Sequence, residues 1–308
     1  MKVKDIHFRG KDVDGGGEIG IEIEMEGENI PNYERVLMGT QNVWKGERDG
    51  SLRGQSVEFV LRRPVPRKDV NTALRIAKEY LEEKCNAIMK PSSRTGVHVH
   101  INVRDLTLNQ VFVFMITWFL VEEAMVAYCG ETREGNLFCL RLKDAEALLD
   151  YAELAIRHED LSILHTDEIR YSAMNTKSLL EYGSLEFRCL ETPENILDIA
   201  LWVELLLKIK DYSLKIKDPE VILQDISING GEKFAKEIFG ELLPLLPVKD
   251  WTELLYDSLR KIQPLVYARN WEEEAAPIQI ELQDLPKNII EAKKQKLFSA
   301  RQIIDYGL

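Results

Sequence analysis

The length and composition of the chain are those of an ordinary globular protein. It has 308 residues, enough for one large domain or two of average size. Hydrophobic residues make up 45% of the sequence and charged residues 30%, which is typical of soluble proteins. The formal net charge is -12 and no run of Lys and Arg offsets it. Electrostatic binding to nucleic acid or to a membrane surface is therefore excluded as the main activity.

The apolar segments and the cysteines indicate a cytoplasmic protein. The N-terminal stretch MKVKDIHFRG lacks the apolar centre of a signal peptide. The longest apolar run, VFVFMITWFLV at 111–121, meets Glu122 and Glu123, and it is too short for a bilayer span of about 20 residues. We expect a buried helix there. The cysteines are scattered and form no CxxC pair, which predicts reduced thiols without disulfides or a zinc site: Cys85, Cys129, Cys139 and Cys189.

Alternation of apolar and polar residues predicts strands mainly in the first half of the chain. The clearest are 18–26, 55–62, 96–103 and 184–190, and weaker candidates are 3–9, 35–44 and 168–175. Helical spacing of apolar residues predicts helices over 67–84, 107–128 and 143–158.

The character of the sequence changes at Pro193. The segment PENILDIALWVELLLKIKDYSLK runs apolar at helical spacing after its opening proline and glutamate. Three more helix-like segments follow: KFAKEIFGELLPLL, DWTELLYDSLRKI and PKNIIEAKKQKLF. We predict an α+β portion over 1–192 and a mostly helical portion over 193–308 packed on it, as two domains or as one.

The first clear strand carries three glutamates on one face. In GIEIEMEG at 20–27, Glu22, Glu24 and Glu26 occupy every second position, so in a strand they point to the same side. Three like charges in a row repel one another. Either this is a solvated edge strand whose charges discourage aggregation, or metal ions lie over that face.

The next strand adds one more acid. In RDGSLRGQSVEFVLRRP at 48–64, Asp49 and Gly50 indicate a turn, and Glu58 alternates with apolar residues. Taken alone, Glu58 has the pattern of an ordinary surface residue.

Two of the five histidines share one strand face. In TGVHVHINV at 95–103, His98 and His100 alternate with valines and an isoleucine. A single histidine on a sheet is usually structural, whereas a pair on a polar face is a candidate for metal binding.

The last predicted strand pairs an acid with an arginine. In YGSLEFRCLE at 182–191, Glu186 and Arg188 share the face opposite the apolar residues. They form either an exposed ion pair or a metal ligand beside a phosphate-binding guanidinium. The segment IRYSAMN at 169–175 places Arg170 and Asn175 shortly before them. Such polar faces on several antiparallel strands predict an open sheet surface for two hard cations, Mg²⁺ or Mn²⁺.

The same motifs, taken in order, resemble a known protein family. GxExE lies at 20–24, DxSL at 49–52 with a later glutamate, HVHI at 98–101, RYxxxN at 170–175 and EFR at 186–188. This series resembles the amidoligase family, which is similar to glutamine synthetase and glutamate–cysteine ligase, over about residues 18–192. The resemblance implies an α+β fold with a mainly antiparallel sheet of the carboxylate–amine ligase type, helices on one face and a helical C-terminal portion.

Carried over position by position, the resemblance also implies roles for these residues. Those assigned to Mg²⁺ or Mn²⁺ are Glu22, Glu24, Glu58, His98 and Glu186. Those assigned to ATP phosphates, nucleotide or substrate are Arg188, Arg170, His100 and Asn175. Glu26 and His100 are the candidates for the base that deprotonates the amine, and Asp49 is an alternative contact for that amine. In the family a proline closely follows the acid of the second motif, whereas here it is delayed to Pro64, so the resemblance does not define the shape of the substrate edge.

The activity implied is an ATP- and Mg²⁺-dependent ligase that joins a carboxylate to an amine through an acyl phosphate. Its partners would be small-molecule or peptide carboxylates and amines, and a homo-oligomer is compatible with the sequence. Three alternatives stay open: a phosphotransferase acting on a guanidino or other nitrogen with the same fold, a non-catalytic nucleotide- or metal-binding assembly protein, and a metal-dependent hydrolase.

Overall fold

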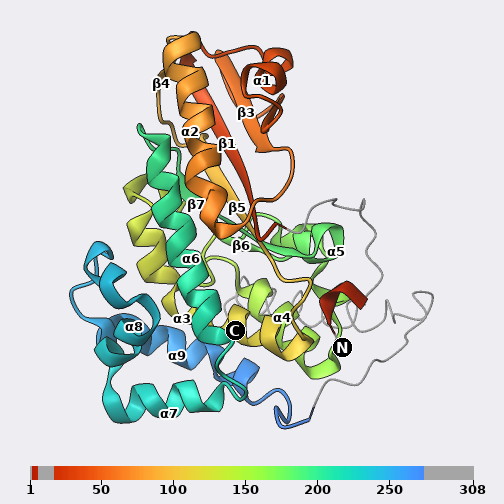
Figure 1. Cartoon of the computed structure of the whole chain (residues 1–308). Coiled ribbons are helices and arrows are strands. Elements are labelled where there is room, and N and C mark those ends of the chain that lie inside the picture. Colours follow the sequence, from red (N-terminus) through yellow and green to blue (C-terminus); the bar gives the residue numbers. More distant parts are fainter. Residues whose placement is uncertain (1, 6–16, 274–308) are drawn as a thin grey trace, which may run out of the picture. The chain divides into compact units, whose positions relative to one another are not determined.

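The alternating segments pair into one antiparallel sheet, which the computed structural model in Figure 1 shows with helices along one side. Residues 2–5 and 17–273 are described; they fall within one compact unit, Met1–Ala275, which contains residues on both sides of position 193. The remaining unit, Ala276–Leu308, lies outside the described residues, as does the predicted helix over 286–298.

The sheet has seven strands in the order β2-β3-β1-β5-β7-β6, and β4 pairs with β1. Each pairing within it is antiparallel. The strands are β1 (Ile19–Glu28), β2 (Trp44–Glu47), β3 (Gln55–Leu61), β4 (Ile88–Met89), β5 (Gly96–Asn102), β6 (Met174–Asn175) and β7 (Ser184–Glu191). The four clearest strand predictions are confirmed. The two short strands β2 and β4 were not predicted, because so few residues show no clear alternation.

The apolar face of the sheet is covered by three helices: α2 (Val70–Glu79), α3 (Leu108–Tyr128) and α6 (Ile199–Ser213). The ring of Phe187 on β7 lies 4.7 Å from that of Trp118 on α3. The indole of Trp44 donates a hydrogen bond to the carbonyl of Ala73 on α2 at 2.9 Å. Since residues two apart in a strand share a face, burying these apolar side chains turns the polar set the other way.

Helix α3 is long and apolar enough to cross a membrane, but 83% of its most apolar window is buried inside the protein. Its partners are α6, α9 and the sheet. It is therefore the central core helix, as its sequence predicts.

The other helices pack around this core. Their bounds are α1 (Tyr33–Gly39), α4 (Glu146–His158), α5 (Ser178–Tyr182), α7 (Glu220–Asn229), α8 (Gly231–Phe239) and α9 (Trp251–Val266). Helix α9 contacts α3, α4 and α8, so the helical C-terminal portion is joined to the core through α3.

Two of the weaker strand predictions are wrong over most of their length. Within 35–44, residues up to Gly39 belong to helix α1, because Asn32 caps the helix by accepting a hydrogen bond from the backbone of Glu34. Within 168–175, only Met174–Asn175 forms a strand.

Two other sequence predictions need correction near their starting residues. For the segment 3–9, Val3–Asp5 is a 3-10 turn and the rest lies outside the described residues. The helix after Pro193 begins later than its sequence suggests, with a 3-10 turn capped by Asn195 before α6 starts at Ile199.

The start of α3 offers a simple stability test. Thr107 accepts a hydrogen bond from the backbone of Gln110, whose side chain accepts one from the backbone of Thr107. Thr107→Ala is expected to lower the free energy of unfolding by about 1 kcal/mol, which is about 2–4 °C in the melting temperature. Thr107→Ser keeps the hydroxyl and should melt close to wild type. Equal losses in both variants would contradict a capping role.

Candidate functional site

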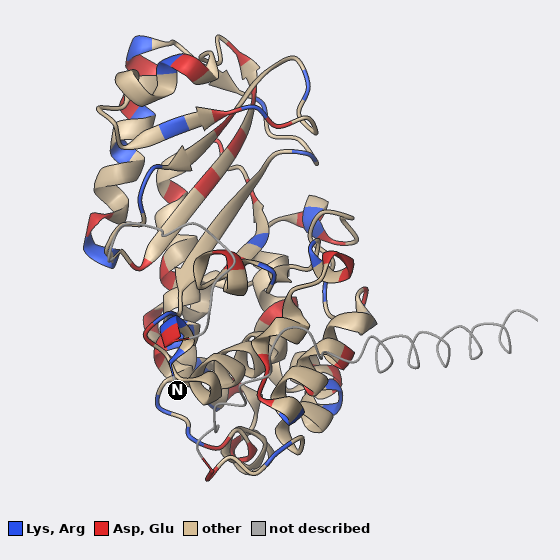
Figure 2. Ribbon diagram, turned by 90° about the vertical axis from the view of Figure 1, so that its right-hand side faces the viewer, with Lys and Arg blue, Asp and Glu red and all other residues tan. Residues whose placement is uncertain are grey.

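Seven of the predicted site residues converge on the open face of the sheet: Glu22, Glu24, Glu58, His98, His100, Glu186 and Arg188. Figure 2 shows acidic residues following one another along neighbouring strands. The register explains their proximity. Glu22 lies opposite His98, Glu24 opposite Glu58, and His100 opposite Glu186.

Glu22 lies at the centre of this group. One of its carboxylate oxygens is 3.1 Å from Nδ1 of His98, and the other is 3.5 Å from Nε2 of His100. Burial opposes ionisation of Glu22, but hydrogen bonds and charge from the two histidines outweigh it, and its pKa lies well below the usual value. Burial lowers the pKa of His100, but its hydrogen bond to Glu22 and the charges of Glu186 and Glu22 outweigh this effect and raise it. Glu22 is therefore ionised and lies between the imidazoles of His98 and His100.

Two sets of three side chains can each surround one metal ion, and Glu22 belongs to both. The first set is Glu22, Glu58 and His98, and the second is Glu22, His100 and Glu186. In each set one potential ligand atom per residue lies within 4.8 Å of the others. Mixed carboxylate and imidazole donors suit Mn²⁺ or Mg²⁺. A shared carboxylate would place two ions side by side.

The predicted ligand Glu24 belongs to neither set. One of its oxygens accepts a hydrogen bond from the backbone of Gly96 at 2.9 Å, and the other lies 3.8 Å from Nε2 of His98. Burial is the main cause of its raised pKa. His100, predicted to contact nucleotide or substrate, instead belongs to the second set.

The pKa of Glu58 is raised by burial and by the neighbouring carboxylates. Burial and then the charges of Glu22, Glu24, Asp49 and Glu47 raise its pKa to about 8. A bound cation would relieve this repulsion, because it favours the ionised form of every carboxylate around it.

The metal-free protein is expected to lose stability as the pH rises from 4.5 to about 8. Folded Glu58 keeps its proton over this window whereas the unfolded chain has lost it, so the folded state binds more protons and rising pH favours unfolding. Glu58→Gln cannot ionise and should remove about 2 kcal/mol of this decrease. Urea unfolding with excess EDTA at about pH 5 and about pH 9 measures it. Equal decreases in the variant and in wild type would contradict this origin.

Glu186 is held by two neighbours that the sequence had singled out. The amide of Asn175 donates to one of its oxygens at 2.7 Å, and Arg188 contacts the other at 2.8 Å. The Nε atom of Arg188 is buried and has no hydrogen-bond partner among the described residues.

Glu26, one of the two candidate bases, is hydrogen-bonded to neighbouring loops. Its carboxylate accepts hydrogen bonds from the backbone of Arg53 at 2.6 Å and from the hydroxyl of Ser92 at 3.1 Å, and Arg94 lies 3.5 Å away. These contacts tie together the loops before β3 and β5. Glu26 is not among the described residues that line the cavity next to this face of the sheet, which is described below.

A cavity of about 390 Å³ opens beside the candidate metal-binding face, which is the face of the sheet that carries Glu22, Glu58, His98, His100 and Glu186. Its lining includes Glu24, His98 and Arg188 from the sheet, and also the predicted residues Asp49, Arg170 and Asn175. Arg170 makes no hydrogen bond to the carboxylate cluster; its guanidinium rests on the ring of Tyr171 at 4.5 Å. The six lining residues that sequence reasoning missed are Ser51, Arg94, Arg133, Phe138, Tyr171 and Lys177.

The missed residues come from loops and turns, where periodicity gives no information. Tyr171 and Ser51 lie inside the RYxxxN and DxSL motifs, directly after Arg170 and two residues after Asp49. Nothing in the local sequence distinguishes Arg133 or Phe138. Their positions depend on how the segment after α3 folds back over the sheet.

Comparison with known proteins finds no protein family that matches the sequence and no curated relative with significant similarity.

Proposed function

We propose that the protein is a ligase that uses ATP and Mg²⁺ or Mn²⁺ to join a carboxylate to an amine, on a fold of the glutamine synthetase type. One observation carries the proposal: Glu22 is shared by two sets of metal ligands, and Arg188 lies directly beside them. Two ions and an arginine are the elements that phosphoryl transfer requires, since it depends on positioning and charge neutralisation. The motif series, which contains the same residues, is a second support. We place the protein in the cytoplasm, where ATP is supplied.

Bound at these two sets, divalent ions would neutralise the ATP phosphates and the substrate carboxylate, which otherwise repel each other. The chain itself supplies Arg188, whose unpartnered Nε can donate to the oxygens of the transferred phosphoryl group. Asn175 and Arg188 keep Glu186 in place from both sides. The terminal phosphoryl group passes to the substrate carboxylate and ADP leaves. The amine then attacks the acyl carbon and phosphate departs.

The proposal is tested by ADP release with Mg²⁺ and a panel of carboxylates and amines. We expect ADP to form only when both donors are present, with an amide as product. If ATP and Mg²⁺ bind without any turnover across a broad panel, the non-catalytic alternative is favoured. Bond cleavage without ATP would indicate a hydrolase.

A phosphotransferase is the second candidate, because the carboxylate of Asp49 on the cavity wall also suits a guanidinium acceptor. That reaction releases ADP with a single acceptor and leaves a stable N-phosphorylated product. Mass spectrometry of the product separates the two reactions.

A further inference from the structure

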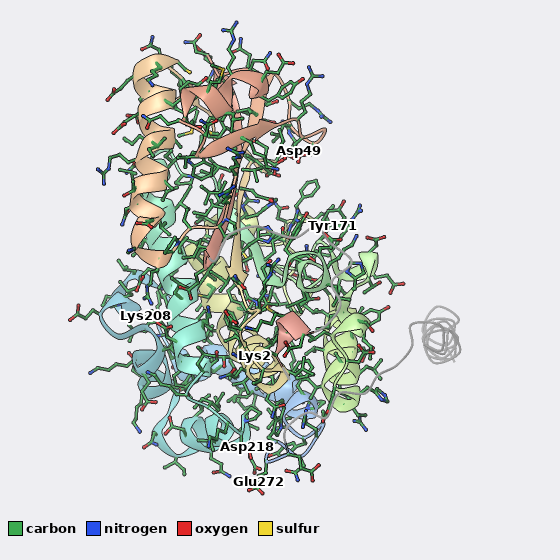
Figure 3. All side chains as sticks on the ribbon, turned by 45° about the vertical axis from the view of Figure 1, so that its right-hand side comes forward. Lys2, Asp49, Tyr171, Lys208, Asp218 and Glu272 are labelled. Carbon is green, nitrogen blue, oxygen red and sulfur yellow. The ribbon has the colours of Figure 1, made fainter. Side chains whose placement is uncertain are left out.

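The cavity beside the metal-binding face has an acidic side and a basic side. Asp49 and Ser51 belong to the loop between β2 and β3, whereas Arg170, Tyr171 and Lys177 belong to the segment around β6. Asp49 and Tyr171 are labelled in Figure 3, on facing segments. Such an arrangement is complementary to a ligand with one positive and one negative end.

Asp49 has no cationic partner within residues 2–5 and 17–273. The backbone N–H of Ser51 donates a hydrogen bond to its carboxylate at 2.5 Å and so fixes the direction of the side chain. Burial is the main cause of the raised pKa of Glu24 and of Glu58, and the charge of Asp49 adds to both. Asp49 is therefore close to the metal-binding face and free to accept a hydrogen bond from a ligand.

Five cationic side chains line the same cavity, and three of them already have carboxylate partners: Lys177 pairs with Asp167, Arg188 with Glu186 and Arg94 with Glu26. The other two, Arg133 and Arg170, have no carboxylate partner in the part of the chain that the structure describes.

These two arginines are held in place without being neutralised. Arg133 is 2% exposed, its Nη2 atom donates to the carbonyls of Thr95 and Leu190, and its Nε atom has no hydrogen-bond partner among the described residues. Arg170 is exposed; it stacks on the ring of Tyr171 and donates to its hydroxyl at 2.6 Å. A buried donor without a partner is costly, so Arg133 points to a ligand that carries an acceptor.

We infer that this cavity binds a zwitterionic amino acid, which is the amine substrate of the proposed ligase. Its ammonium group lies at Asp49, beside the metal-binding face, and its carboxylate lies at Arg170 and Arg133. This inference rests on the proposed function for the reaction, although the binding itself does not require turnover.

The reaction balances with the groups that the site supplies. The ammonium group gives one proton to Asp49, and the nitrogen lone pair then attacks the acyl carbon of the acyl phosphate. A C–N bond forms while the C–O bond to phosphorus breaks, and inorganic phosphate leaves with that electron pair. A second nitrogen-bound proton passes to solvent. The product is an N-acyl amino acid whose carboxylate remains at the arginines.

Binding is measured by saturation-transfer NMR on the full chain with Mg²⁺ and a non-hydrolysable ATP analogue. The probes are a mixture of free amino acids, the same compounds as C-terminal amides, and the same compounds N-acetylated. We expect the free amino acids to bind at least about 10-fold more tightly than either blocked form, because each blocked form loses one charge-assisted contact. Equal binding of all three classes, or no detectable binding, overturns the inference.

Two variants separate the two ends of the ligand. Arg170→Ala should weaken binding of free amino acids about 10-fold or more and leave their amides unaffected. Asp49→Asn keeps the acceptor for Ser51 and should weaken both classes alike. Arg157→Ala removes a similarly exposed arginine that pairs with Glu153 on α4 and serves as the matched control. If Arg170→Ala weakens amides as much as free amino acids, the carboxylate contact is wrong.

The ATP analogue distinguishes the failure of this inference from failure of the proposed function. If the wild-type protein binds neither the ATP analogue nor Mg²⁺, the proposed ligase function is rejected. Normal nucleotide binding without discrimination among the three probe classes would leave the ligase proposal standing and reject the amino-acid site.

Discussion

Glu22→Gln is expected to weaken the binding of Mn²⁺ at both candidate positions, by at least about 100-fold. The amide is neutral and offers one oxygen in place of two, whereas the carboxylate of Glu22 contributes to both sets of ligands and contacts both histidines. A single substitution thus damages two sites. Electron paramagnetic resonance of free Mn²⁺ in a titration measures the number of ions bound and their affinity.

The other ligands provide the controls for this titration. Glu58→Gln should affect one ion and Glu186→Gln the other, since each belongs to one set only. Glu153 lies on α4 and belongs to neither set of ligands. The Glu153→Gln protein should therefore bind Mn²⁺ as wild type does. Two ions bound by the Glu22→Gln protein with nearly unchanged affinity would show that the shared-ligand arrangement does not exist.

Arg188→Ala is expected to lower the rate of ADP formation by about 1,000-fold, measured at saturating Mn²⁺ because Arg188 also holds the candidate ligand Glu186 in place. Arg188 contributes a positive charge and a planar set of donors next to Glu186, and its Nε atom has no partner within the described part of the protein. Its proposed contact forms with the transferred phosphoryl group, so the loss should fall on kcat more than on the binding of nucleotide.

Arg188→Lys is the matched variant. It keeps the charge but cannot present two parallel donors, so we expect partial recovery, with a rate between those of Arg188→Ala and wild type. Circular dichroism and the melting temperature check that both variants fold. Should Arg188→Ala retain a rate within about tenfold of wild type, the role assigned to this arginine in phosphoryl transfer is incorrect.

The candidate metal ligands could be predicted because they lie within regular strands. Alternation assigns Glu22, His98 and Glu186 to the face opposite the apolar residues, and the structure places them there because Ile23, Val99 and Phe187 are buried against helices. Burial of apolar area is the dominant favourable term in folding. Pattern alone is therefore enough to determine which face each of these polar side chains occupies.

Pattern fails where local hydrogen bonds decide the conformation. The segment 35–44 alternates well enough to suggest a strand, yet the cap from Asn32 begins helix α1 there. The predicted base Glu26 lies on the correct face, but loops that are distant in the sequence take up its carboxylate through Arg53 and Ser92. Neither outcome can be read from alternation, because each depends on partners outside the segment.

By itself, the sequence determined an α+β chain whose strands have one apolar and one acidic or imidazole-bearing face. The tertiary structure alone decided which strands are neighbours, and hence that Glu22 meets both histidines and that Asp49 shares a cavity with Arg170. The physical reason is the distance along the chain between the residues that interact. Side-chain direction within a strand depends on adjacent residues, whereas strand order and loop placement depend on packing between segments far apart in the chain.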